Sequence, residues 1–408
     1  MNEDQIFTQR RVWLFGRLIP ALYLFMTLKF LFRGDWLIAP DGSRLWTDFL
    51  ATWSAGDQAR HAGAVSVYGI TALDAVQNGV VSNLAGLHLP FAYPPTFLLV
   101  AVPLSSIPYV PAFLAWQAVT LCLYAGAVYA IIPRREAVVL ALAFPAVFSN
   151  VYVGQESLLA AALFAAALAF LDRRPILAGI ALGLLTFRPQ LGILFPIVLI
   201  LTGRWRVFGS AMITTLCLAS ASLIFFGVDA WRAFFDHAAE HAAATLSDGQ
   251  ASGSWVVLQS VYALVRNLGG TAALAWLSHI AIAALAALFV VRIWRQRSVR
   301  YELKAAALGL GAAVVTPYLY FYDLSILAIP VAFLIADGLK YGFARFERLA
   351  ILAAAISTVI FVPGLFAPVG PFIMAVIAAI LFARLRGQTA IETRLVDELP
   401  LLDGRMHP

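Results

Sequence analysis

Long apolar runs separated by short basic clusters make up most of the chain. Runs of about 17–25 residues, long enough to cross a bilayer as a helix, recur along its whole length. Short groups of Arg and Lys between apolar helices are typical of cytoplasmic turns. Here they are Arg10-Arg11, Arg134-Arg135, Arg173-Arg174, Arg204 with Arg206, 292–304, 340–348, and Arg384 with Arg386. The pattern predicts an all-α polytopic membrane protein.

The spacing of these clusters predicts a topology. If each cluster marks a cytoplasmic turn, an even number of spans separates neighbouring clusters, which gives about twelve transmembrane helices with both ends inside. They are expected to begin near Val12, Pro111, Ala137, Glu156, Ile176, Pro189, Val207, Ala272, Leu303, Leu324, Leu349 and Pro371. The apolar stretch 94–107 would break the parity. It is short and contains Pro103, so we expect an interfacial or re-entrant element.

Two long polar segments remain on the outward side of this topology, at about residues 33–110 and 227–270. The first contains amphipathic helical patterns at 48–62 and 71–80, together with the aromatic side chains expected at a headgroup interface. The second contains a Gly/Ser-rich stretch, 247–254, which is typical of a mobile loop. A loop of this kind either gates a site or simply connects two helices.

The composition also indicates a membrane protein, and it argues against a nucleic-acid partner. Hydrophobic residues make up 62% of the chain and charged residues 12%, with a mean hydropathy of +0.86. Soluble domains are about 45–50% apolar and about 25% charged. The formal net charge of +6 comes mostly from the basic clusters, so it does not indicate a nucleic-acid partner. Cys122 and Cys217 lie inside apolar runs, and a structural disulfide is not expected.

A small set of polar residues falls at the outward helix ends, where ionisable groups are costly and usually functional. Asp48 lies early in the first outward segment, within Trp46-Thr47-Asp48-Phe49. The others are Gln155, Glu156, Arg188, Gln190, Tyr318, Tyr322 and Asp323. Because they share one side, they favour an enzyme with a site at the membrane surface over a channel.

Each charged member of this set has two interpretations. Arg188 lies in an outward turn against the positive-inside bias, so its guanidinium either binds a lipid phosphate or snorkels to headgroups. Asp48 and Asp323 each either serve the site or cap the helix that follows. Glu156 either interacts with a helix dipole or positions a sugar hydroxyl.

His237 and His241 have the i, i+4 spacing that can present two imidazoles to a metal. With no third ligand nearby in the sequence, an exposed amphipathic face is the simpler interpretation. Gly309-Leu310-Gly311 follows no strand, so it does not predict a nucleotide loop. The sequence has no DxD pair or Walker motif either, so the activated donor of a transferase would have to arrive within the membrane.

Several of these residues follow the order found in a known family. The matching segments are Asp48-Phe49 with Trp53, Val67-Tyr68, Phe91-Ala92-Tyr93-Pro94-Pro95, Pro103-Leu104, Gly154-Gln155, Arg173-Arg174, Ala178-Gly179, Phe187-Arg188-Pro189, Thr316-Pro317-Tyr318 and Tyr322-Asp323. Over about residues 45–335 the chain resembles glycosyltransferase family 87. That family belongs to the GT-C superfamily of membrane enzymes, which use polyprenyl-phosphate sugars as donors.

The resemblance implies one integral GT-C domain over residues 1–408, with a catalytic module at 1–226 and variable helices at 227–408. It implies inverting transfer of mannose, or of another hexose or pentose, to a lipid or glycan acceptor. The active site would face the extracytoplasmic side of the inner (plasma) membrane. Asp48 matches the superfamily's general base. Some relatives use a divalent ion and others do not, so the need for a metal stays open and no metal ligand is assigned.

The resemblance also suggests roles for the remaining residues. Arg188, where the family often has Lys, would stabilise charge on the leaving phosphate. Asp323 stands where relatives often carry His. The predicted substrate-binding set is Arg188, Gln155, Glu156, Tyr93, Gln190, Tyr318, Tyr322, Asp323 and His237. The alternative is a transporter or flippase for a lipid-linked sugar, although the chain lacks the internal repeat typical of transporters. A third interpretation, a ligase for whole glycans, would call for more basic groups.

Overall fold

The computed structural model describes residues 8–81, 84, 86–247, 255, 257–358 and 368–403. Within these ranges the chain is helical, with isolated β-bridges and no strand, so the predicted all-α class is confirmed. The elements are α2 (Gln9–Arg33), α3 (Phe49–His61), η1 (Ala64–Tyr68), α4 (Ile70–Val80), α5 (Pro95–Ser105), α6 (Tyr109–Ile131), α7 (Arg135–Leu142), α8 (Pro145–Val153), α9 (Ser157–Phe170), α10 (Pro175–Leu184), η2 (Leu185–Phe187), α11 (Pro189–Gly192), α12 (Leu194–Leu201), α13 (Trp205–Ser247), α14 (Val261–Asn267), α15 (Ala272–Arg295), α16 (Tyr301–Val315), η3 (Phe321–Leu327), α17 (Ala328–Tyr341), α18 (Glu347–Ser357) and α19 (Gly370–Asp403). Most of the Gly/Ser stretch, 248–254, lies outside the described residues.

Fewer helices are long enough to cross a membrane than the sequence predicts. The described residues contain six such helices, or seven if α7 and α8, which meet at a 55° bend, form one span. The long ones are Gln9–Arg33, Tyr109–Ile131, Trp205–His241, Ala272–Arg295, Phe321–Tyr341 and Gly370–Gln388. The predicted count of twelve is therefore not confirmed. Several expected spans are shorter apolar helices, because proline and short turns divide the apolar runs.

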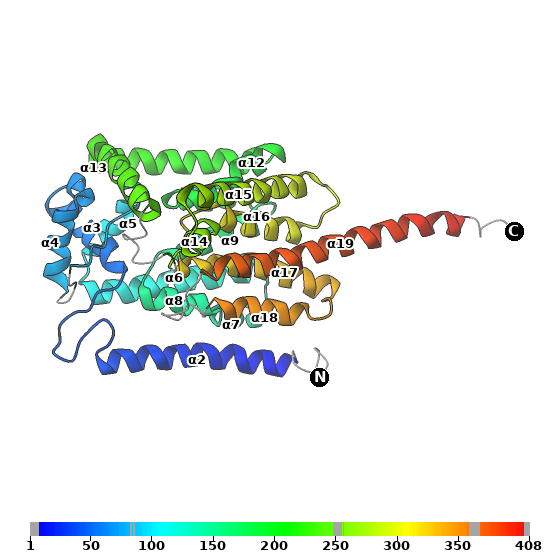
Figure 1. Ribbon diagram of the computed structural model, residues 1–408, viewed down its shortest axis with the longest axis horizontal. Coiled ribbons are helices and arrows are strands. Elements are labelled where there is room, and N and C mark those ends of the chain that lie inside the picture. Colours follow the sequence, from blue (N-terminus) through cyan, green and yellow to red (C-terminus); the bar gives the residue numbers. More distant parts are fainter. Residues whose placement is uncertain are drawn as a thin grey trace.

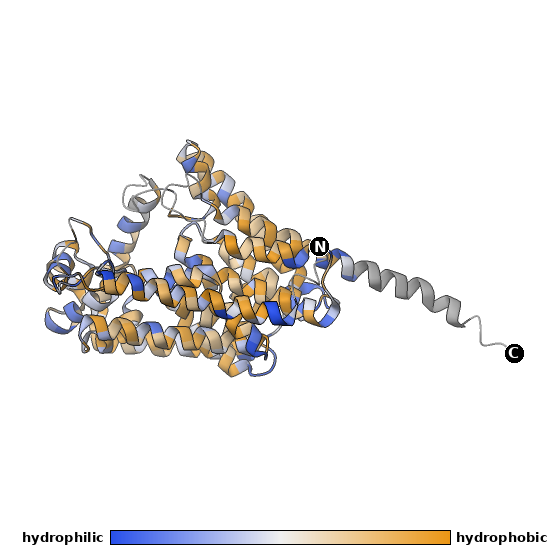
Figure 2. Cartoon of the chain, turned by 90° about the horizontal axis from the view of Figure 1, so that it is seen from below, coloured by the Kyte–Doolittle hydropathy of each residue, from blue (hydrophilic) through white to orange (hydrophobic). Residues whose placement is uncertain are grey.

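The long helices run along one axis as a bundle, and α3, α4 and α5 lie together at one end of it (Figure 1). The opposite end holds the start of α2, and α19 extends beyond it (Figure 1). Hydrophobic residues cover the middle of the bundle, while hydrophilic ones gather toward its two ends (Figure 2). This distribution is the one expected for a protein that crosses a bilayer.

The predicted basic clusters meet at one end of the bundle, opposite α3, α4 and α5. Arg204 pairs with Asp172 at 2.8 Å and lies over the ring of Trp294. Arg300 and Arg384 both pair with Asp337, at 3.0 and 2.5 Å. We call this end the basic end, and the end with α3, α4 and α5 the site end.

At the site end, two predicted amphipathic segments form α3 and α4, within two residues of the expected bounds. The proline-rich stretch forms α5, a separate helix of 11 residues. Helices α3 and α5 touch through Gly56, where an added Cβ would lie 2.1 Å from the carbonyl oxygen of Ala101. Helix α13 turns at Gly227, whose φ of 78° breaks the helix, and its second half packs on η1 and α5. These contacts hold α3, η1, α5 and the second half of α13 together at the site end.

Candidate active site

Asp48 lies just before α3, where that helix meets the end of α8. Its backbone N–H donates to the carbonyl of Val153 at 2.8 Å, and its carboxylate accepts a hydrogen bond from Gln155 Nε2 at 2.7 Å. The side chain makes no capping hydrogen bond to α3, although Asp48 is the N-cap residue. The interpretation of Asp48 as a helix cap is therefore wrong, and its carboxylate faces Gln155 instead.

A tight turn brings Gln155 and Glu156 to this point. Gly154 ends α8 in the left-handed conformation, with φ of 88°, and a Cβ there would lie 2.6 Å from the ring of Phe113. The turn directs Glu156 toward α3, where Thr52 donates to its carboxylate. Thr52 follows Asp48 by four residues, so the two side chains share one face of α3.

Arg188 points into the protein, not toward headgroups. It precedes Pro189, which favours an extended backbone, and its φ of −127° and ψ of 70° end the helical turn η2. The side chain is about 6% exposed, and its guanidinium pairs with Asp323 and lies 4.0 Å from Glu156. The snorkelling interpretation of Arg188 is therefore wrong.

Asp323 caps η3 and also binds Arg188 and Ser157. One carboxylate oxygen accepts from the backbone N–H of Tyr320 at 3.1 Å, as part of a capping box at the start of η3. The other accepts from Arg188 and from the hydroxyl of Ser157, the latter at 2.5 Å. Asp323 thus fixes the start of η3 against both α9 and the turn that carries Arg188.

Tyr93 connects these groups to Asp48. Its hydroxyl accepts from Arg188 at 3.0 Å, donates to Glu156, and lies 3.2 Å from the side-chain oxygen of Gln155. A continuous chain of polar contacts therefore runs from Asp323 through Arg188, Tyr93 and Gln155 to Asp48. We call this chain the relay.

A cavity of about 380 Å³ opens beside the Asp48 end of the relay. The ring of Trp36 stacks with Tyr152 at 5.9 Å between centroids, and its indole N–H donates to the carbonyl of Tyr152 at 2.9 Å. The cavity is lined by Asp35, Trp36, Leu45, Trp46, Thr47, Asp48, Tyr152, Val153 and Phe321. Aromatic walls with a few fixed polar groups are typical of small-molecule sites.

The surroundings of Asp48 tune its acidity. Burial raises the pKa of the carboxyl group to about 6, the negative charge of Glu156 adds to this rise, and the hydrogen bond from Gln155 opposes it. A carboxylate with this pKa is mostly ionised at neutral pH, yet it accepts a proton more readily than an ordinary aspartate. These are the properties of a general base.

The comparison with protein families decides the class. The family model of glycosyltransferase family 87 matches residues 91–317, which is more than half of the chain. The chain belongs to glycosyltransferase family 87. None of the curated proteins or solved structures compared with it matches. The matched segment includes Tyr93, Gln155, Glu156 and Arg188, whereas Asp48 and Asp323 lie outside it.

Only some of the other predicted site residues of this family 87 glycosyltransferase lie next to the relay. Tyr322 is buried, stacks on Tyr320 with ring centroids 5.3 Å apart, and directly precedes Asp323 in η3. Tyr318 packs in a separate apolar cluster. Gln190 is half-buried, and within the described ranges it has no hydrogen bond to the relay. The structure therefore joins Tyr322 to the site, but not Tyr318 or Gln190.

His237 and His241 stack on the second half of α13, with ring centroids 5.9 Å apart. His237 is buried beside Tyr68, which rules out the exposed face expected for it, and Tyr68 donates to the backbone carbonyl of Tyr93 at 3.0 Å. In the part of the chain that the structure describes, no group of three or more potential ligands could hold a metal ion.

Sequence reasoning missed four residues of the candidate site. Thr52 donates to Glu156, Ser157 donates to Asp323, and Trp36 and Tyr152 form part of the cavity wall. A signal existed for the first two, because Thr52 lies one turn after Asp48 and Ser157 directly follows Glu156. Nothing in the spacing of Trp36 and Tyr152, which are far apart in the chain, indicates that their rings stack.

Proposed function

We propose that this glycosyltransferase moves a sugar from a polyprenyl-phosphate donor to an acceptor hydroxyl, with Asp48 as general base. The observation that carries the proposal is the placement of the Asp48 carboxylate, which lines the cavity and is held from behind by Gln155. The donor would be a mannosyl lipid or another hexosyl or pentosyl lipid, and the acceptor a lipid or glycan. The GT-C type architecture is part of this proposal.

The reaction is a single displacement. The acceptor oxygen bonds to the anomeric carbon while the bond from that carbon to the phosphate oxygen breaks, so the anomeric centre inverts. Asp48 takes the hydroxyl proton, a contribution of typically about 10²–10⁴-fold to the rate. The leaving group is the polyprenyl phosphate, which keeps the electrons of the broken bond.

Arg188 is proposed to stabilise the charge that develops on the leaving phosphate. Its guanidinium is committed to Asp323 and Tyr93, but its buried Nε has no hydrogen-bond partner among the described residues. The Nε–H group of Arg188 is therefore available to donate a hydrogen bond to the substrate. Tyr93, Gln155, Glu156, Tyr322 and Asp323 are proposed to position the reactants. Gln190, Tyr318 and His237 have no proposed contact with them.

The placement of the basic clusters supports a site on the extracytoplasmic side of the inner membrane. The basic clusters gather at the end of the bundle opposite Asp48, and clusters of this kind favour the cytoplasm. A polyprenyl-phosphate sugar presents its headgroup at the membrane surface, which is where the site end would lie. Helices α3, α4 and α5 would then be juxtamembrane elements.

The test compares wild type with Asp48→Asn, using a panel of polyprenyl-phosphate sugars and a membrane lipid extract. We expect transfer by wild type and a loss of about 10²–10⁴-fold in the variant, with donor binding retained. Asp57→Asn, on the outer face of α3, removes a carboxylate from the same helix and is the matched control.

Near-normal turnover by Asp48→Asn would refute the assignment of the base. If neither protein transfers sugar but both move the lipid-linked sugar across a vesicle bilayer, the transporter interpretation would replace the enzyme.

A further inference from the structure

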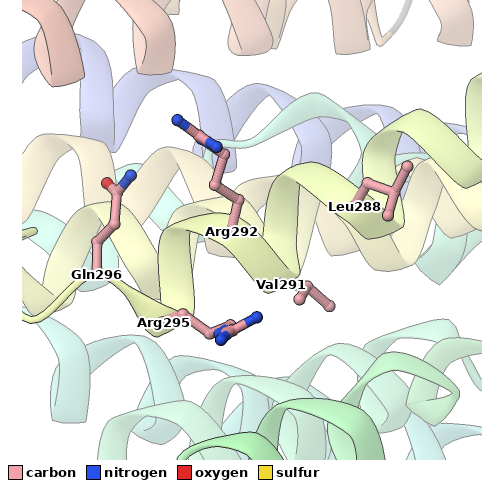
Figure 3. A pocket seen from close by; sticks show the side chains of 5 residues that line it. All are labelled: Leu288, Val291, Arg292, Arg295 and Gln296. Carbon is pink, nitrogen blue, oxygen red and sulfur yellow. The ribbon is translucent and has the colours of Figure 1, made fainter.

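A second cavity lies at the basic end, far from Asp48. Its volume is about 510 Å³, and it is lined by Leu288, Val291, Arg292, Arg295 and Gln296, all from the end of α15 and the residue that follows it. Figure 3 shows the side chains in two adjacent rows along α15, with Arg292 and Gln296 in one row and Val291 and Arg295 in the other, and both rows line the cavity. The cavity combines strongly basic groups with an apolar floor.

The two arginines that line the cavity differ from the paired arginines at this end. Arg204, Arg300 and Arg384 each pair with a carboxylate. Arg292 and Arg295 are exposed, and in the described ranges neither has an ion pair or hydrogen bond to another residue. They stand in the last turn of α15, where a helix dipole favours positive charge. The helix dipole explains why positive charge is favoured at these two positions. It provides no ion-pair or hydrogen-bond partner for either guanidinium group.

The same face of α15 is apolar below the arginines. Leu285, Leu288, Arg292 and Arg295 follow one another at intervals of three or four residues, so they share a face of the helix. Leu285 and Leu288 are 63% and 65% exposed, and α15 is one of the helices long and apolar enough to cross a membrane. The face therefore changes from apolar to basic at the expected membrane surface.

We propose that this surface binds an anionic phospholipid. Its phosphate accepts hydrogen bonds from Arg292 and Arg295, Gln296 donates its amide to the headgroup, and one acyl chain lies along Leu285 and Leu288. Charge complementarity selects this occupant, since a zwitterionic headgroup would bring a positive choline close to two unpaired guanidinium groups. The proposal does not rest on the proposed function, because no residue of the relay takes part.

The experiment titrates the purified full chain in neutral detergent with phosphatidylglycerol, and separately with phosphatidylcholine, while native mass spectrometry counts bound lipids. We expect saturable binding of phosphatidylglycerol to wild type. Arg292→Gln with Arg295→Gln should weaken it about 30-fold, the product of two surface-charge contributions. The control is Arg134→Gln with Arg135→Gln, which removes the same charge from another exposed pair at the basic end.

Leu288→Gln separates the two halves of the site. It should weaken binding of phosphatidylglycerol but leave unchanged the weaker binding of glycerophosphoglycerol, which has no acyl chains. Unchanged binding in the arginine variant, or equal binding of the two phospholipids, would overturn the proposal. So would complete displacement of the lipid by millimolar inorganic phosphate, which would indicate a site for free phosphate. Equal melting temperatures of all variants exclude misfolding as the cause.

Discussion

Two clusters of buried charge stand at opposite ends of the bundle and are built differently. At the basic end, Arg300 and Arg384 face Asp337 and Glu347, so positive and negative groups match in number. At the site end, Arg188 alone faces Asp323 and Glu156, and the relay continues from it to a further carboxylate, Asp48. One cluster is balanced and the other is not.

The difference shows what each cluster can do. Taking charges out of water is costly, and mutual pairing in good geometry offsets that cost. The balanced cluster ties α17, α18 and α19 together and leaves no carboxylate free for chemistry. At the site end the excess negative charge contributes to the raised pKa of Asp48, next to a cavity. Imbalance of this kind is typical of functional sites.

The comparison of the two charge clusters can be tested by substitution, and the largest effect on stability is expected at the balanced cluster. Arg384→Met removes a buried guanidinium and leaves Asp337 and Glu347 facing each other, so the free energy of unfolding should fall by about 3–5 kcal/mol. Thermal or denaturant unfolding in detergent measures this. Arg386→Met, an exposed position on the same helix, is the control. Equal stability of the two variants would show that the cluster does not hold the helices together.

A smaller effect, on activity, is expected from Arg188→Lys. Lysine keeps the positive charge but cannot reach Asp323 and Tyr93 at once with a planar fork. We expect kcat to fall about 10–100-fold, as for loss of a hydrogen bond to a charged group, while the protein still folds. Steady-state kinetics with a fixed donor measure this. Wild-type kcat in the variant would contradict a role for the fork in the relay.

The smallest effect is a shift along the pH axis. Asp48 must be ionised to accept a proton, so kcat/KM of wild type should rise with pH through about 6 and then level off. In Gln155→Leu the hydrogen bond that lowers the pKa is lost, so the rise should move to higher pH. Gln117→Leu, a buried glutamine on another helix, is the control. A uniform loss at every pH would indicate a purely structural role for Gln155.

The sequence predicted the class of protein, most helix positions and most of the polar residues that meet at one end. These features follow from local pattern: apolar runs form helices, and basic clusters mark their turns. The number of full spans could not be predicted in this way. Hydropathy locates an apolar run, but it does not show where the run is divided into shorter helices, as it is at Arg188. The amphipathic segments that became α3 and α4 were found correctly by the same periodicity.

The partners within the site could not be predicted. The ion pair of Arg188 joins residues 135 positions apart, and the hydrogen bond from Gln155 to Asp48 joins residues 107 positions apart. Local spacing carries no information about such contacts. For that reason an outward arginine suggested snorkelling, and an aspartate before a helix suggested a cap, although packing gave both side chains other partners.

These separations also set an order of assembly. A chain emerging from the ribosome contains Arg188 well before Asp323, and Asp48 well before Gln155. Of the two carboxylates that Arg188 approaches in the structure, only Glu156 is present in the chain before η3 is made. Contacts between distant segments form late and slowly. The relay is therefore expected to be among the last parts of the molecule to form, because it is complete only when Asp323 has arrived.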